Sequence, residues 1–113
     1  MKMYGIPNCD TVKKARKFLD NHNADFEFHD FKKSGLTINQ VQTWLQQQPI
    51  EKLVNKRSTS WKQLTDIQKA ALMDQTDLSI LEEMPTLIKR PVLELENTIL
   101  VGFKAAEYEQ AIK

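Results

Sequence analysis

Residues 5–15 read GIPNCDTVKKA, and this stretch decides how the chain begins to fold. The preceding residues, 2–5, are short and apolar-leaning, which is typical of a strand that the glycine and proline then end. Beyond the turn, apolar residues recur at helical spacing on one face: Val12, Ala15 and Leu19. A strand, a tight turn and a helix therefore meet at Cys9, the only cysteine of the chain.

The remaining β-type segments extend this beginning. Alternation at residues 25–29 predicts a second strand, which completes a βαβ unit. Two short apolar runs, 92–95 and 98–101, stand at hairpin spacing, and apolar residues from 105 to 112 mark a closing helix. The order βαβ, helices, ββα predicts an α/β protein with a thioredoxin-like fold and a helical insertion.

The middle of the chain reads as this insertion. A turn is expected at residues 32–35, and Thr37 with Gln40 has the spacing of a capping box, as has Thr65 with Gln68. A further short helix is expected after Asp77 and up to Pro85. Residues 55–64 are polar and without periodicity, which predicts a loop. No linker or repeat interrupts residues 1–113, so we expect a single domain.

The charge and the apolar content of the chain argue against two classes of protein, nucleic-acid binders and membrane proteins. The 113 residues carry 16 basic and 15 acidic side chains, a formal charge of +1, which does not favour direct binding of nucleic acid. No apolar segment approaches a membrane span, and the first residues lack the apolar core of a secretory signal. A free thiol with no export signal predicts a cytoplasmic protein.

The position of Cys9 suggests chemistry. The first N–H groups of a helix lack partners and carry positive potential, so a sulfur at the helix start gains stabilisation in its ionised, nucleophilic form. Asp10 opposes this effect, while the cations that follow support it, although most of them are expected to form a solvated helix face. The alternative is a buried, unreactive cysteine. We predict that Cys9 is a catalytic nucleophile.

A second cysteine is missing where dithiol enzymes have one. The residue three positions after Cys9 is Val12, so a mixed disulfide on Cys9 cannot be resolved within the chain. An outside thiol must complete the turnover, and glutathione is the abundant cytosolic candidate. We therefore expect glutathione as a co-substrate and no bound cofactor.

Cations suited to anionic ligands complete the predicted site. Arg57 and Arg90 lie outside the first helix, and arginine matches two carboxylate or oxyanion oxygens at once. Asn8 in the first turn and Lys14 on the helix belong to the same predicted anion-binding set. His22 and His29 lack a third ligand at suitable spacing, so no metal site is expected.

Three segments carry a family resemblance: PNCDTVKKAR, VNKRSTSWKQL and IKRPVLELENTILVGF. They resemble, in order, the signature regions of the ArsC/Spx family of glutaredoxin-coupled arsenate reductases and their relatives, and the first looks closest to the YffB-like branch. The resemblance implies Cys9 as nucleophile, Arg57 and Arg90 as anion ligands, and Pro91 in the cis form against the active-site sulfur.

Three functions follow from these observations. The leading one is a glutathione-dependent thiol–disulfide oxidoreductase that uses Cys9 alone. The second is a glutaredoxin-coupled arsenate reductase; family members use a third arginine after the last strand, where this chain has Lys104. The third is a non-enzymatic, Spx-like module that binds a protein such as RNA polymerase, although Val12 removes the CxxC switch typical of that branch.

Overall fold

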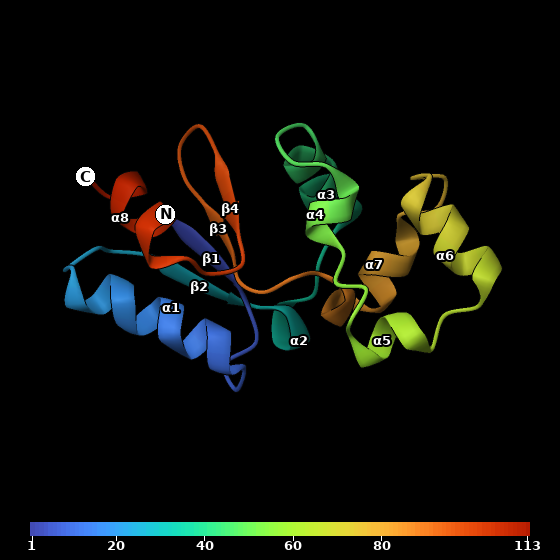
Figure 1. The fold of residues 1–113 in the computed structure, drawn as a ribbon, viewed down its shortest axis with the longest axis horizontal. Coiled ribbons are helices and arrows are strands. Elements are labelled where there is room, and N and C mark those ends of the chain that lie inside the picture. The colour runs from blue at the N-terminus through green and yellow to red at the C-terminus, as the bar shows by residue number, and fades with distance from the viewer. The chain divides into compact units, whose positions relative to one another are not determined.

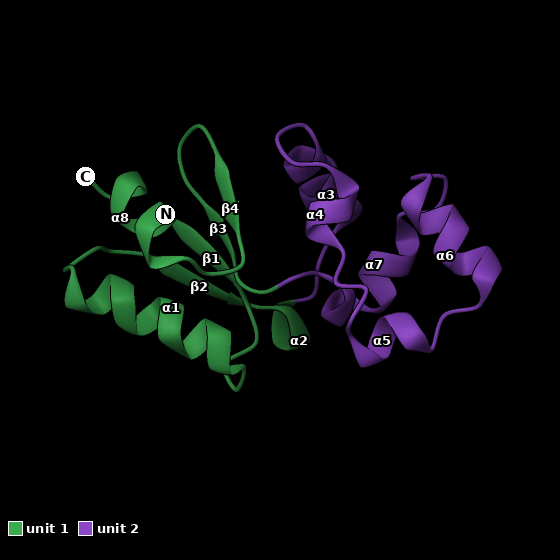
Figure 2. Ribbon diagram, viewed as in Figure 1, with its two compact units in different colours: residues 1–34, 90–113 green, residues 35–89 purple.

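A computed structural model describes all 113 residues and divides them into two compact units (Figure 2). The first unit combines residues 1–34 with residues 90–113, and the second consists of residues 35–89. The second unit is thus inserted between two halves of the first, as the order of the predicted elements indicated. The expectation of a single domain stays a prediction beside this division.

The first unit is built on a four-stranded sheet in the order β2-β1-β3-β4 (Figure 1). Strand β1 pairs in parallel with β2 and antiparallel with β3, and β3 pairs antiparallel with β4. Its elements are β1 (Lys2–Gly5), α1 (Asp10–Asn21), β2 (Glu27–Asp30), α2 (Phe31–Ser34), β3 (Val92–Glu94), β4 (Ile99–Val101) and α8 (Ala105–Ala111). The predicted thioredoxin-like βαβ…ββα arrangement is confirmed.

The two faces of this sheet bury different side chains. Met3 and Leu93 stand opposite each other and belong to the core that α1 and α8 complete. The rings of Phe18 and Tyr108, one from each helix, meet edge to face with centroids 6.0 Å apart. On the other face, the Tyr4 hydroxyl donates a hydrogen bond to Glu94 at 3.0 Å.

The second unit is helical. It contains α3 (Ile38–Leu45), α4 (Ile50–Leu53), α5 (Thr59–Lys62), α6 (Asp66–Met73), α7 (Ser79–Glu83) and the 3-10 turn η1 (Pro85–Leu87). Both predicted capping boxes form: Thr37 and Gln40 exchange hydrogen bonds at the start of α3, as do Thr65 and Gln68 at α6. No helix of either unit has both the length and the apolar character needed to cross a membrane.

Two local predictions are wrong. The segment 55–64, expected as a loop, contains the short helix α5, because the Ser58 hydroxyl accepts a hydrogen bond from the Trp61 N–H and starts a turn too short to show periodicity. The segment 32–35, expected as a turn, mostly belongs to α2, whose buried residue Phe31 anchors it. This helix ends before Gly35, whose φ of +73° suits a residue without a side chain.

Candidate active site

Cys9 lies between the end of β1 and the start of α1, as the sequence predicts. It is the N-cap residue of α1, with extended backbone angles of φ −86° and ψ 127°. Its N–H donates to the carbonyl oxygen of Ile6 at 3.2 Å, and its own carbonyl accepts from the Lys13 N–H at 2.9 Å. The side chain itself makes no capping hydrogen bond. The backbone therefore fixes the position of Cys9 and leaves its sulfur atom uncommitted to the helix amides.

A close approach between β1 and α1 holds this turn. A side-chain Cβ built on Gly5 would lie 2.8 Å from Cγ2 of Val12, closer than real side chains come. Val12 is fully buried in the first turns of α1. The absence of a side chain at Gly5 lets the helix start sit directly against the strand end. Sequence reasoning used Gly5 only as a strand end and missed this contact.

The surroundings of Cys9 are mixed. Its side chain is partly exposed, and it packs against the core formed by Met3, Val12, Ala15, Leu19, Leu93 and Tyr108. A sealed, unreactive thiol would be fully buried, and Cys9 is not. The same core holds a polar atom that the sequence did not reveal: the hydroxyl of Tyr108 is buried and has no hydrogen-bond partner.

Strand register brings further predicted residues to the same end of the sheet. Tyr4 pairs with Val92, and Val92 pairs with Val101, so the end of β1, the start of β3 and the end of β4 lie side by side. The Arg90–Pro91 peptide bond, directly before β3, is cis, as the family resemblance implies. The carbonyl of Pro91 accepts a hydrogen bond from the Gly102 N–H at 2.8 Å.

The same register locates two cations. Arg90 precedes β3, and Lys104, the N-cap of α8, follows β4 by three residues. Arg90 is partly buried, with its Nε atom fully so, whereas Lys104 is exposed. Cys9, Arg90, Pro91 and Lys104 are therefore all attached to one end of the sheet in the first unit.

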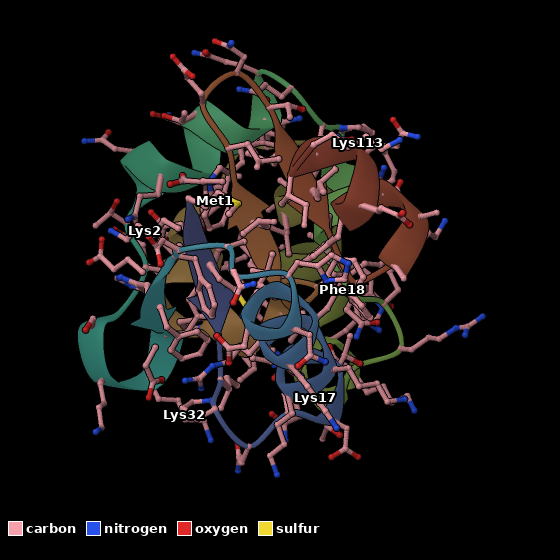
Figure 3. All side chains as sticks on the ribbon, turned by 90° about the vertical axis from the view of Figure 1, so that its left-hand side faces the viewer. Met1, Lys2, Lys17, Phe18, Lys32 and Lys113 are labelled. Carbon is pink, nitrogen blue, oxygen red and sulfur yellow. The ribbon has the colours of Figure 1, made fainter.

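The other predicted site residues lie on the surface. Asn8 and Lys14 are exposed, and Lys17, one helical turn further along α1, lies on its outer side (Figure 3). Arg57 belongs to the helical unit, in the turn before α5, where its N–H donates to the Asn55 side chain at 3.0 Å. Its guanidinium side chain is exposed. The assignment of Asn8, Lys14 and Arg57 to an anion site stays a prediction.

The chain contains no group of three or more His, Cys, Asp or Glu side chains that could hold a metal ion. His22 stacks on Phe18, with ring centroids 4.1 Å apart, and His29 lies against Tyr4 at 4.8 Å. Both histidines thus take part in aromatic packing. The chemistry available in the first unit is that of a partly exposed thiol, with Arg90 and Lys104 on segments attached to the same end of the sheet.

Comparisons with known proteins agree with this arrangement. The ArsC family model matches residues 4–111. An uncharacterised protein of Haemophilus influenzae is 46% identical over 109 residues, which cover 96% of each chain. The solved structure of the YFFB (PA3664) protein has a TM-score of 0.93 and 38% identity, covering 99% of this chain and 98% of the other. The global transcriptional regulator Spx of Lactiplantibacillus plantarum is 29% identical, covering 93% of this chain and 80% of the regulator.

Proposed function

This chain belongs to the ArsC family, and from that premise we propose that it is a glutathione-dependent thiol–disulfide oxidoreductase with Cys9 as its only nucleophile. The observation that carries the proposal is the place of the single thiol: a partly exposed N-cap residue of α1, at the sheet end from which the cis Arg90–Pro91 bond also projects. Family membership supports a thiol reductase in general, and the missing second cysteine supports an external thiol as reductant.

The proposed reaction has two exchanges. The Cys9 thiolate attacks the glutathione sulfur of a mixed disulfide, so that a Cys9–glutathione disulfide forms and the substrate thiol leaves as a thiolate that takes up a proton. A second glutathione, as thiolate, then attacks the glutathione sulfur of this adduct. Oxidised glutathione is released, and Cys9 returns to its thiolate form. In total the mixed disulfide is reduced to the free substrate thiol, and one glutathione thiol joins the glutathione released from that mixed disulfide as oxidised glutathione.

Cationic side chains are assigned to the recognition of glutathione. Glutathione carries two carboxylates, and arginine binds a carboxylate through two parallel hydrogen bonds. Arg90 is the first candidate because it directly precedes Pro91 at the start of β3 and its side chain is partly buried. We assign Arg57 the same role on the basis of the family motif, with Asn8 and Lys14 as additional contacts at the start of α1.

The direct test is the fate of Cys9 with oxidised glutathione. Mass spectrometry of the wild-type protein should show one glutathione adduct, which excess reduced glutathione removes, and Cys9→Ser should show none. In a coupled assay with a small glutathione mixed disulfide, Cys9→Ser should abolish turnover. Arg90→Gln should raise the KM for glutathione about tenfold or more, the loss of one charge-assisted contact, while Lys13→Gln serves as a control. A wild-type protein that forms no adduct would refute the proposal.

Arsenate reduction is a second candidate, favoured by the match to the ArsC family. Cys9 would displace a hydroxyl group of arsenate and form a thiol–arsenate adduct, and glutathione would attack the cysteine sulfur, which releases arsenite and leaves a mixed disulfide for glutaredoxin. The segment after the last strand, where family reductases have an arginine, contains Lys104 instead, and a lysine offers a point charge without the two parallel donors of a guanidinium group. Glutaredoxin-coupled arsenate turnover that rises in Lys104→Arg would support this candidate.

Binding without catalysis is the third candidate, favoured by the 29% identity to the regulator Spx. A chain of this kind would retain a protein partner such as RNA polymerase whatever the state of its thiol. Retention of polymerase subunits that Cys9→Ser does not change, in a protein without reductase activity, would favour this function over both reactions.

A further inference from the structure

The helical unit holds two ammonium groups on one indole ring, and the proposed reaction uses neither. Nζ of Lys56 lies 5.7 Å from the ring centroid of Trp61, and Nζ of Lys69 lies 5.5 Å from it. The three side chains come from the turn before α5, from α5 itself and from α6. Both ammonium groups lie within 5.7 Å of the ring centroid, so the distance between the two nitrogen atoms is at most twice that value.

The stretch of sequence that contains this ring, residues 52–69, carries mostly positive charge. Five of the six cations in residues 35–89 fall between positions 52 and 69, and Asp66 is the one carboxylate in that stretch. Asp66 stands three residues before Lys69 on α6, yet Lys69 contacts the indole instead of pairing with it. Lys56 is exposed, and Lys69 and Trp61 are half-buried. Two positive charges, those of Lys56 and Lys69, thus lie at a half-buried aromatic ring.

The indole ring does not use the hydrogen-bond donors of these two ammonium groups. A cation–π contact at an exposed site is weak, and it leaves the three N–H donors of each ammonium group available. The two ammonium groups carry like charge, so an anion bound by both would reduce their mutual repulsion. A ligand with a single negative charge would neutralise one of them. A phosphoryl group carries close to two negative charges and three acceptor oxygens, so it matches both.

We propose that Lys56, Trp61 and Lys69 form a binding site for a phosphoryl group, with the two lysines contacting its oxygens. Free phosphate or diphosphate and the phosphates of a nucleotide share this chemistry. The indole distinguishes them, because a nucleotide base can stack on the Trp61 ring once the ammonium groups turn toward the phosphate. The site is independent of Cys9 and requires no redox step.

Trp61 itself reports on binding. The only other tryptophan, Trp44, is fully buried, so a change in fluorescence on addition of sodium pyrophosphate at constant ionic strength should come from Trp61. We expect a saturable change in wild-type protein and its loss in Trp61→Phe. Lys56→Gln and Lys69→Gln should each weaken pyrophosphate binding about tenfold or more, measured by calorimetry. Lys52→Gln, which removes an exposed cation from α4 of the same unit, should leave it unchanged.

The source of the phosphoryl group is decided by comparing pyrophosphate with ADP. Tighter binding of ADP, lost in Trp61→Leu, indicates a nucleotide, and equal binding indicates a free phosphate; both outcomes support the site. The proposal is overturned if sodium chloride reproduces the fluorescence change, or if Lys56→Gln and Lys52→Gln bind pyrophosphate equally. Thermal unfolding of each variant confirms that it is folded, and reductase activity should be unchanged in all of them.

Discussion

The contact between Gly5 and Val12 gives the sharpest test of how the Cys9 turn is built. In Gly5→Ala the new methyl group would lie 2.8 Å from Cγ2 and 3.5 Å from Cγ1 of Val12, and its third neighbour is Cβ of the same residue at 3.8 Å. Val12 thus supplies all three of the nearest atoms. Overpacking of this kind costs about 1–3 kcal/mol of the free energy of unfolding.

Val12→Ala should compensate for this cost. Alone, it removes two buried methyl groups, a loss of about 2 kcal/mol from transfer and cavity terms. In the double variant the nearest remaining atom is Cβ at 3.8 Å, an ordinary van der Waals contact. We therefore expect the double variant to be about as stable as Val12→Ala, with a coupling free energy of about 1–3 kcal/mol.

Urea unfolding of the four proteins measures this cycle, with unchanged m-values as the check on two-state behaviour. Gly102→Ala is a control in which the loss of stability has a different cause. A Cβ at Gly102 would meet no atom within 4 Å, but the backbone φ of +78° is unfavourable for alanine, so Val12→Ala should not reduce the loss. Additive losses for Gly5→Ala and Val12→Ala would refute the steric explanation. The rate of Cys9 alkylation should change in Gly5→Ala and recover in the double variant.

Two further predictions concern stability. Burial, and then the neighbouring Glu107 carboxylate, raise the pKa of Tyr108 above its ordinary value, so the unfolded chain loses this proton first and stability should fall as the pH rises above about 10. Tyr108→Phe should remove that part of the alkaline loss and, because the hydroxyl is buried without a partner, should stabilise the protein at pH 7 or leave it unchanged, as thermal unfolding at both pH values would show. Thr37→Ala should lower the free energy of unfolding by about 1 kcal/mol because it removes the side chain that caps α3, whereas Thr37→Ser keeps the capping hydroxyl and should retain most of the stability. Equal losses for the two variants in urea unfolding would contradict the role of the cap.

Sequence reasoning succeeded where a local signal was complete. The first helix, both capping boxes and the paired strands near the C-terminus follow from apolar spacing and cap residues, and the order of elements then gives the fold. It failed at α5 and α2, because a four-residue helix is only about one 3.6-residue turn long, too short for apolar spacing to repeat, and depends on single contacts such as the Ser58 cap.

The candidate site divides in the same way. The N-cap position of Cys9 follows from the turn that precedes α1, and the cis form of the Arg90–Pro91 bond agrees with the family resemblance. The close approach of Gly5 to Val12, the unpaired hydroxyl of Tyr108 and the cations around Trp61 depend on which residues meet in space. No spacing along the chain encodes those contacts.

The insertion of residues 35–89 separates the two central strands, β1 and β3, in sequence and therefore also in the order in which the ribosome releases them. Strand β1 can pair with β2 early, but its other neighbour is β3, and the Glu94 that pairs with Lys2 is synthesised more than ninety residues after it. The helical unit, in contrast, is one continuous segment. Contacts of long sequence separation form slowly, and N-terminal segments emerge first from the ribosome. We therefore expect the helices of residues 35–89 to form during translation, while the pairing of β1 with β3 waits until the C-terminal strands are released.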